Sequence, residues 1–392
     1  MPKISDQPLR ILHAVRAPVG GIIRHILDLA NGQAERGHQV GLITDSLTGG
    51  ERASAALAEI APRMKLGVYR LAIHREPHPG DAIVWARLRR LIERVKPDVL
   101  HGHGAKAGVF LRLKGASKTA IRVYTPHGGS LHYPLTTLKG ALYSRIERAL
   151  MNRTDLFLFE SAFARDTYQR TIGTPAAGLV RCVFNGVTSG EFDPVVKADD
   201  ATDLVYVGEF RNIKGADLLV DAVARLRSAG DPVKLTLAGD GEETAALKAQ
   251  VQRLGLDDAV RFIGHVKARY GFSKGSLLVV PSRGDSMPYV VIEAAAAGIP
   301  MIAANVGGIP EIFGPYSDAL FTPNQPAAMA DAIKAARTNP TAAQDRAKAM
   351  RDRTFTHFSQ NAMVEGVLAG YRDAFVAVGA PGCYPRAAGV SL

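Results

Sequence analysis

The sequence is poor in features that would place it outside a reducing compartment or inside a membrane. Its 392 residues include two cysteines, Cys182 and Cys383, which are too few and too far apart for a disulfide framework. We therefore expect a reducing, cytoplasmic setting. No run of about 18 apolar residues is present, so no membrane-spanning helix is predicted. The N-terminal residues lead directly into an apolar segment, without the pattern of a cleavable signal peptide.

Several motif classes are also missing. No group of His, Cys and Asp residues has the spacing typical of a metal site, so none is predicted. No recognition helix or base-stacking pattern of aromatic residues is found, so we expect no nucleic-acid partner. The chain has no internal repeat at the spacing of a solenoid.

The net charge of +11 lies in the first half of the chain. Residues 1–190 carry a net charge of +13 and residues 191–392 carry −2. A basic half suits a phosphorylated acceptor or an anionic membrane surface. The predicted helix at residues 85–96 shows five basic residues opposite an apolar side, which is typical of an ordinary surface helix and also of a membrane-facing one.

Apolar segments of strand length alternate with helical patterns along both halves. We predict an α/β protein with two doubly wound Rossmann-like domains. The expected domains are residues 1–190 and 203–355, separated by an acidic, unpatterned linker, and followed by a last helix at 356–378 and a tail at 379–392. The predicted strands include residues 10–15, 38–44, 98–101, 121–125, 156–160, 234–239, 260–264, 276–280 and 301–304.

Candidate binding residues in the first half follow predicted strands. Gly20 and Gly21 come between a strand and a helix, where glycines let backbone N–H groups approach an anion. His127 comes directly after the strand at 121–125, at the sheet edge where open α/β folds bind ligands. A capping or packing histidine is the alternative, and His101 and His103 lie in similar positions.

The second half offers a cationic pair after a strand. Arg211 and Lys214 follow the apolar run that begins at Leu204. Arginine binds two oxygens as a fork and lysine acts as a point charge, so the pair suits a diphosphate. Two solvated loop charges are the simpler alternative. Gly239 ends the next predicted strand.

The stretch 281–311 contains the most specific pattern. Asp285 follows the strand at 276–280, and Glu293 comes eight residues later on a predicted helix. A helix N-terminus binds anions such as phosphate, and a carboxylate accepts hydrogen bonds from sugar hydroxyls or a ribose diol. The alternative is a helix cap and a buried helix acid. The expected N-terminus consists of Ser286, Met287, Pro288, Tyr289 and Val290.

This stretch resembles the donor-sugar signature of glycosyltransferase family 4, retaining enzymes of the GT-B fold. The family has two Glu residues separated by seven others, then Gly-x-Pro, then Gly-Gly-x-x-Glu; here the last two motifs are residues 298–300 and 307–311. Asp285 replaces the first Glu, so the carboxylate is one methylene shorter. In the segment that resembles Gly-Arg-x-x-x-x-Lys-Gly, Glu209 stands in the arginine's place, and we transfer its role to Arg211.

The resemblance implies a retaining transfer of sugar from a UDP- or GDP-sugar to a glycan or lipid-diphosphate acceptor, in cell-surface polysaccharide synthesis. It implies two domains facing across a cleft, no metal or cofactor beyond the nucleotide sugar, and a place in the cytoplasm or at the inner face of the membrane. Lys214, Arg211 and the helix amides would stabilise the leaving diphosphate.

The remaining site residues also take roles from the resemblance. Asp285 would hold sugar hydroxyls, Glu293 the ribose, and His127 would lie near the reacting carbon. The glycines Gly20 and Gly21 would lie over the donor phosphate or beside the acceptor, and Gly239 would line the base.

Two other functions remain open at this point. One is a sugar-nucleotide epimerase on the same fold; a phosphorylase would need a pyridoxal-binding lysine motif, which we do not find. The other is a non-catalytic nucleotide-sugar-binding protein, which the replaced Glu and the displaced Arg would favour.

Overall fold

The computed structural model describes residues 7–128, 136–176 and 178–379. The chain forms two compact units, unit 1 (Met1–Asn185 with Gln360–Leu392) and unit 2 (Gly186–Ser359). The sequence-based boundaries at 190 and 356 lie within a few residues of these limits, and the expected linker is part of unit 2. Within the described ranges, every helix is too short or too polar to span a bilayer.

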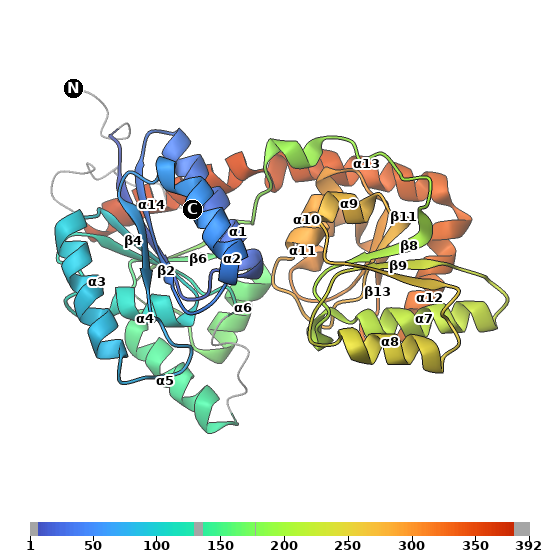
Figure 1. The fold of residues 1–392 in the computed structure, drawn as a ribbon. Helices are drawn as coiled ribbons and strands as arrows, with labels where there is room; N and C mark the ends of the chain where they lie inside the picture. The colour runs from blue at the N-terminus through green and yellow to red at the C-terminus, as the bar shows by residue number, and fades with distance from the viewer. Residues whose placement is uncertain (1–6, 129–135, 177, 380–392) are drawn as a thin grey trace. The chain divides into compact units, whose positions relative to one another are not determined.

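Unit 1 contains a sheet of seven parallel strands in the order β3-β2-β1-β4-β5-β6-β7 (Figure 1). The strands are β1 (Arg10–Val15), β2 (Gln39–Asp45), β3 (Gly67–Leu71), β4 (Val99–His103), β5 (Ile121–Thr125), β6 (Leu156–Phe159) and β7 (Leu179–Cys182). The helices are α1 (Gly20–Glu35), α2 (Gly50–Ile60), α3 (Asp81–Val95), α4 (Ala105–Arg112), α5 (Leu138–Met151), α6 (Ala162–Thr171) and α14 (Gln360–Val378).

Both faces of this sheet are covered, which explains why its strands are continuous apolar runs. Successive side chains of β1 enter different cores: Ile11 packs in a cluster with Leu29 of α1 and Tyr371 of α14, whereas Leu12 packs in a cluster with Leu88 of α3. Helix α14 therefore completes the core of unit 1, although unit 2 separates it in sequence from the rest of that unit.

Unit 2 contains six parallel strands in the order β10-β9-β8-β11-β12-β13. They are β8 (Thr202–Val207), β9 (Leu235–Ala238), β10 (Val260–Gly264), β11 (Gly275–Val280), β12 (Met301–Ala304) and β13 (Leu320–Phe321). The helices are α7 (Ala216–Ser228), α8 (Thr244–Arg253), α9 (Ala268–Phe272), α10 (Tyr289–Ala296), α11 (Ile309–Phe313), α12 (Pro326–Thr338) and α13 (Pro340–His357). Two doubly wound sheets are the α/β fold that the sequence predicts.

A buried ion pair joins α4 to α5 in unit 1. Nη2 of Arg112 lies 2.8 Å from Oε2 of Glu147, and both residues are almost fully buried. The guanidinium lies 3.6 Å from the ring centre of Tyr124, whose hydroxyl donates to the other oxygen of Glu147 at 2.7 Å. Burial and the adjacent carboxylate raise the pKa of Tyr124 well above its usual value, so it stays neutral.

Replacing Glu147 by Ala should strongly destabilise unit 1, because it leaves the charge of Arg112 buried without a counter-ion. We expect a loss of about 3–5 kcal/mol in the free energy of unfolding. Trp85, the single tryptophan, lies in α3 and reports urea unfolding of this unit by fluorescence. The double change Arg112→Met with Glu147→Leu is the control and should cost far less. Equal losses in the two variants would contradict this account.

Candidate functional site

Both sheets reverse their strand order beside their first strand. The neighbours of β1 are β2 and β4, and those of β8 are β9 and β11. The connections that follow two such neighbouring strands run in opposite directions. They leave a crevice at the carboxyl ends of the strands, where open α/β folds bind ligands. The residues predicted from the sequence follow these strand ends in each unit.

Lys214 and Asp285 meet at the reversal point of unit 2. Lys214 ends a 3-10 turn (Asn212–Lys214) after β8, and Asp285 lies in the loop after β11. Nζ of Lys214 lies 2.5 Å from Oδ2 of Asp285, and the side chains are 28% and 16% exposed. The pair is therefore accessible, so either charge can exchange its partner for a ligand.

Two glycines bring the backbone segments around this pair into close contact. Gly215 has φ of 70°, and a Cβ there would lie 2.1 Å from the carbonyl oxygen of Pro281. Gly307 has φ of 60°, and its Cβ would lie 1.6 Å from the carbonyl oxygen of Asp285, which also accepts a hydrogen bond from the N–H of Gly308 at 3.0 Å. Only glycine fits these positions, so the Gly-Gly turn fixes the backbone of Asp285.

Close backbone packing also explains why position 239 is a glycine. Its Cβ would lie 1.9 Å from the carbonyl oxygen of Gly208, where the turns after β8 and β9 touch. The N–H of Phe210 donates to the carbonyl of Asp240 at 2.9 Å across the same contact. Close packing of the two turns thus accounts for this glycine, and its contact with a base stays a prediction.

Arg211 does not share the partner of Lys214. Its side chain is half exposed and has nitrogens 3.7 Å from Glu209 and 3.9 Å from Glu242. Exposed ion pairs of this length contribute little to stability, so these contacts do not fix its position. The role of Arg211 toward a diphosphate stays a prediction.

Helix α10 begins later than the sequence suggests. Its first residue is Tyr289 and its N-cap is Pro288. Proline has no backbone N–H, so the expectation that Pro288 supplies an amide was wrong. The first-turn N–H groups of Tyr289 and Val290 point out of the helix. Met287 precedes the helix and is buried, and Glu293, one turn inside it, is 9% exposed.

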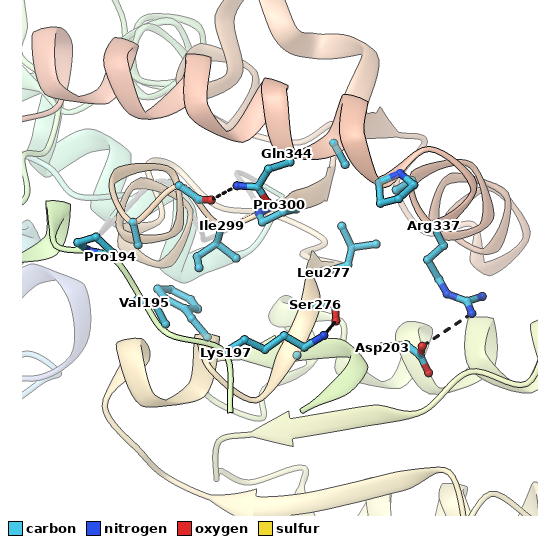
Figure 2. Close-up of a pocket in the computed structure, with 17 residues that line it drawn as sticks. Pro194, Val195, Lys197, Asp203, Ser276, Leu277, Ile299, Pro300, Arg337 and Gln344 are labelled. Atoms are coloured by element: carbon cyan, nitrogen blue, oxygen red, sulfur yellow. Dashed lines mark hydrogen bonds and ion pairs between the residues drawn. The ribbon is translucent and has the colours of Figure 1, made fainter. Parts of the chain in front are cut away.

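A cavity of unit 2 lies at the amino ends of the strands, opposite the edge where Lys214 and Asp285 meet (Figure 2). It measures about 720 Å³, and its lining includes Asp203, Gly275 and Pro300, at the amino ends of β8, β11 and β12. None of the predicted donor-site residues lines it. Its position therefore argues against a donor site there, because ligands of this fold class bind at the carboxyl edge.

Unit 1 contains a cluster of five histidines at its reversal point, four of them buried and the fifth, His127, partly exposed. They come from β1 (His13), α1 (His25), β4 (His101 and His103) and the loop after β5 (His127). Their ring nitrogens form a hydrogen-bonded network with Gln33, Thr125, Asn185 and Tyr371. Two direct bonds between imidazoles, His13 to His103 and His103 to His127, are both 3.0 Å long.

The sequence analysis missed this cluster because its members are spread over more than a hundred positions. The sequence signal was strand register: His13 pairs with His101 and Val15 with His103 on adjacent parallel strands, so the histidines share one face. We expected His103 in an exit turn, but it is the last residue of β4. That extra strand length turns its ring into the cluster.

Burial keeps these imidazoles neutral. Desolvation lowers the pKa of His13 and of His25 to about 4, and burial with repulsion between neighbours lowers the pKa of His103 and His127 well below the usual value. The pKa of His101 is lowered in the same way.

The sequence showed no metal-ligand spacing, but the fold brings two groups of histidines together, and the absence of a metal stays a prediction. The groups His13, His101, His103 and His25, His103, His127 each have ring nitrogens within 4.8 Å of one another. Such groups can hold a transition metal. Hydrogen bonds, however, already occupy eight of the ten ring nitrogens, so hydrogen bonding accounts for the arrangement.

His127 also borders a cavity of unit 1. The cavity measures about 430 Å³ and has three cationic lining residues, Arg16, Arg75 and Lys106. The backbone of His127 has φ of 50°, which is uncommon for a residue other than glycine. Gly20 and Gly21 are exposed at the start of α1, and no contact tests their predicted role.

The neutral histidines should make folding sensitive to acid. At pH 5.5 an unfolded imidazole with a pKa of about 6.5 is about nine-tenths protonated, whereas His13 and His25 remain neutral in the folded chain. Because the folded pKa is the lower one, stability is lost as pH falls below 6.5.

We expect these five histidines to take up about 4.5 protons on unfolding at pH 5.5, measured by calorimetry in buffers of different ionisation enthalpy. At pH 8 neither state is protonated, so the cluster should take up none. An uptake at pH 5.5 below about one proton would show that the cluster is charged in the folded chain.

Two family models match the chain. Glycosyltransferase Family 4 matches residues 19–190, and Glycosyl transferases group 1 matches residues 201–339. Glycogen synthase of Mycobacterium tuberculosis is 25% identical over 367 residues, covering 87% of this chain and 88% of its own. D-inositol 3-phosphate glycosyltransferase of Segniliparus rotundus is 30% identical over 296 residues, covering 69% and 62%.

Solved structures share the fold along nearly the whole chain. Anabaena Alr3699/HepE in complex with UDP has a TM-score of 0.75 at 19% identity, covering 92% of this chain and 99% of that one. Sucrose-phosphate synthase of Thermosynechococcus elongatus has a TM-score of 0.76 at 23% identity, covering 95% and 100%. The two Rossmann-like units are thus those of the GT-B fold, and the family matches, one in each unit, show that this chain belongs to glycosyltransferase family 4.

Proposed function

We propose that this enzyme transfers a sugar from a nucleotide diphosphate sugar to a phosphate-bearing acceptor with retention of configuration. The observation that carries the proposal is the Lys214–Asp285 pair at the reversal point of unit 2. When a donor binds, Lys214 exchanges its carboxylate for the diphosphate, and Asp285 becomes available to accept hydrogen bonds from the sugar hydroxyls. One ion pair thus keeps both groups in place before the donor arrives.

The chemistry follows the charge that develops on the leaving diphosphate. Lys214 and the first-turn N–H groups of α10 stabilise that negative charge electrostatically. As the bond between the sugar and the diphosphate breaks, the acceptor hydroxyl attacks the same face of the sugar. A diphosphate oxygen takes the hydroxyl proton, which keeps the configuration and balances the step. We assign Glu293 to the ribose of the donor and leave Arg211 as a second contact for the diphosphate.

The donor that we favour is a UDP-sugar. The Anabaena protein has been solved with UDP and with UDP-glucose, and it shares the fold of this chain. A GDP-sugar is the alternative, since a mannosyltransferase of Mycobacterium tuberculosis named as GDP-mannose-dependent is 28% identical over 257 residues.

We place the acceptor in unit 1. The 430 Å³ cavity is lined by Arg16, Arg75 and Lys106, with Asp81 and Glu147 beside them. Lys106 pairs with Asp81, so we assign the phosphate groups of a lipid-diphosphate or a phosphorylated glycan to the two arginines. The exposed face of α3 carries Arg87, Arg90 and Arg94, next to Ile83, which is 59% exposed. Such a face suits a peripheral contact with anionic lipid, which would bring a membrane-bound acceptor within reach.

Lys214→Ala should remove about half or more of the stabilisation that UDP gives to the protein. A ligand at 100 times its dissociation constant stabilises the folded state by about 2.7 kcal/mol, and we expect at least a tenfold loss of affinity. The measurement is thermal shift with UDP and GDP. Lys274→Ala is the matched control, because Lys274 pairs with Asp200 at 2.7 Å where β11 begins, at the opposite edge of the sheet. A shift that survives in Lys214→Ala would remove this lysine from the donor site.

The double change Arg87→Glu and Arg90→Glu should release the protein from anionic liposomes. Surface electrostatic attraction is strongest at low salt, so flotation with phosphatidylserine vesicles is best done there, with neutral phosphatidylcholine vesicles as the control. The wild type should float only with the anionic vesicles. If wild type and variant behave alike, α3 is an ordinary surface helix.

A further inference from the structure

We propose that Gln33, His13 and His103 act as positioning residues that fix the tautomer and the orientation of His127. In the chain Gln33–His13–His103–His127, each side chain is hydrogen-bonded to the next. The fixed tautomer presents Nδ1 of His127 as a hydrogen-bond acceptor for a hydroxyl group. That the hydroxyl belongs to a sugar rests on the proposed function, whereas the tautomer itself does not.

Gln33 determines which atom donates and which accepts in each hydrogen bond of this series. Its amide nitrogen lies 3.5 Å from the hydroxyl oxygen of Tyr371, so its carbonyl oxygen faces Nε2 of His13 at 2.8 Å. An amide oxygen only accepts, so Nε2 of His13 must donate. The hydroxyl of Tyr371 lies 2.7 Å from Nδ1 of His101, and Nε2 of His101 lies 2.9 Å from the hydroxyl of Thr125, which agrees with this orientation of the amide.

Because each neutral ring carries one N–H, the donor and the acceptor of every remaining hydrogen bond are then determined. A neutral imidazole has one N–H and one bare nitrogen, and burial keeps these rings neutral by lowering the pKa of each. Nδ1 of His13 is bare, so it accepts from Nε2 of His103 at 3.0 Å. Nδ1 of His103 is then bare and accepts from Nε2 of His127 at 3.0 Å. Nδ1 of His127 is left as the bare nitrogen.

Packing fixes the plane of the His127 ring as well as its proton. The ring meets the edge of His25 at a centroid distance of 4.9 Å and stacks on His103 at 5.3 Å. His25 is itself held by Asn185, at 2.9 Å. His127 borders the 430 Å³ cavity, so a ligand there lies beside this ring, and we assign its Nδ1 as the acceptor. The opposite tautomer would present an N–H instead and would select a different group.

The direct test is the protonation of each ring nitrogen in the ligand-free protein. In ¹H–¹⁵N spectra of wild type at pH 7, Nε2 of His127 should appear as protonated and Nδ1 as bare, with signals assigned by their loss in His127→Asn. A protonated Nδ1 would overturn the proposal. Zinc bound in equal amount to protein prepared without chelator, and shown by the spectra to be held by these rings, would also overturn it.

Gln33→Met tests the far end of the chain. Methionine keeps the volume but removes the acceptor, so His127 should populate both tautomers. We expect kcat with a UDP-sugar to fall at least tenfold with little change in KM, because orientation rather than binding is lost. Thr125→Val is the matched control: it removes one bond of the same cluster, to His101, and should leave the His127 tautomer and kcat unchanged.

The two readouts separate this proposal from the proposed function. If no nucleotide sugar is turned over but Nδ1 of His127 is bare in wild type, the proposed function fails and the positioning chain stands. If a folded Gln33→Met variant kept the wild-type kcat, the proposal that these hydrogen bonds position His127 would be overturned. If that variant does not fold, as Trp85 fluorescence would show, the wild-type spectra still decide.

Discussion

Close contact between backbones at the carboxyl edge of the unit 2 sheet is the constraint that brings Lys214 and Asp285 together. The loops after β8, β9, β11 and β12 touch through carbonyl oxygens that leave no room for a Cβ at Gly215, Gly239 or Gly307. Because the loops brace one another, Lys214 and Asp285 meet at a fixed point although 71 positions separate them. The side-chain chemistry is thus set by main-chain packing, and a single added methyl group would separate the loops.

Unit 1 positions its polar groups by a different means. The rings of His13, His103 and His127 hold one another by hydrogen bonds, and those of His13 and His103 are fully buried. Buried networks of this kind are rigid when every member is satisfied and costly when one is not. A change at one end of the hydrogen-bonded network is therefore felt at the other end.

The sequence was sufficient for the fold, because its strands and turns are local features, and it singled out two residues, Lys214 and Asp285, that the structure brings together. The strands at 10–15, 121–125, 260–264 and 301–304 have the predicted limits, since continuous apolar runs between turn residues leave little choice. Lys214 and Asp285 were singled out because each lies in the segment that follows a predicted strand. The end of β4 and the start of α10 were misplaced by a few residues, since polar His103 and the prolines near Tyr289 obscure the boundaries.

The histidine cluster was beyond the sequence because it depends on register and on helix rotation. Strand pairing decides that His13 faces His101, and the rotation of α1 decides that His25 and Gln33 face inward. Neither the strand pairing nor the rotation of the helix can be predicted from a short stretch of sequence. Burial also reverses the usual expectation for histidine, since a group that commonly titrates near neutrality becomes a fixed neutral donor and acceptor.

The position of α14 has a consequence for synthesis on the ribosome. Unit 2 is one continuous segment, Gly186–Ser359, and its chain is complete before α14 is made. Unit 1 lacks one wall of its core until residues 360–378 emerge, because Leu368, Tyr371 and Phe375 belong to that core. Unit 2 can thus finish folding before unit 1 can. The sheet of unit 1 stays partly uncovered until α14 has been synthesised. Until then the nascent unit 1 exposes apolar surface, which is the kind of surface that chaperones bind.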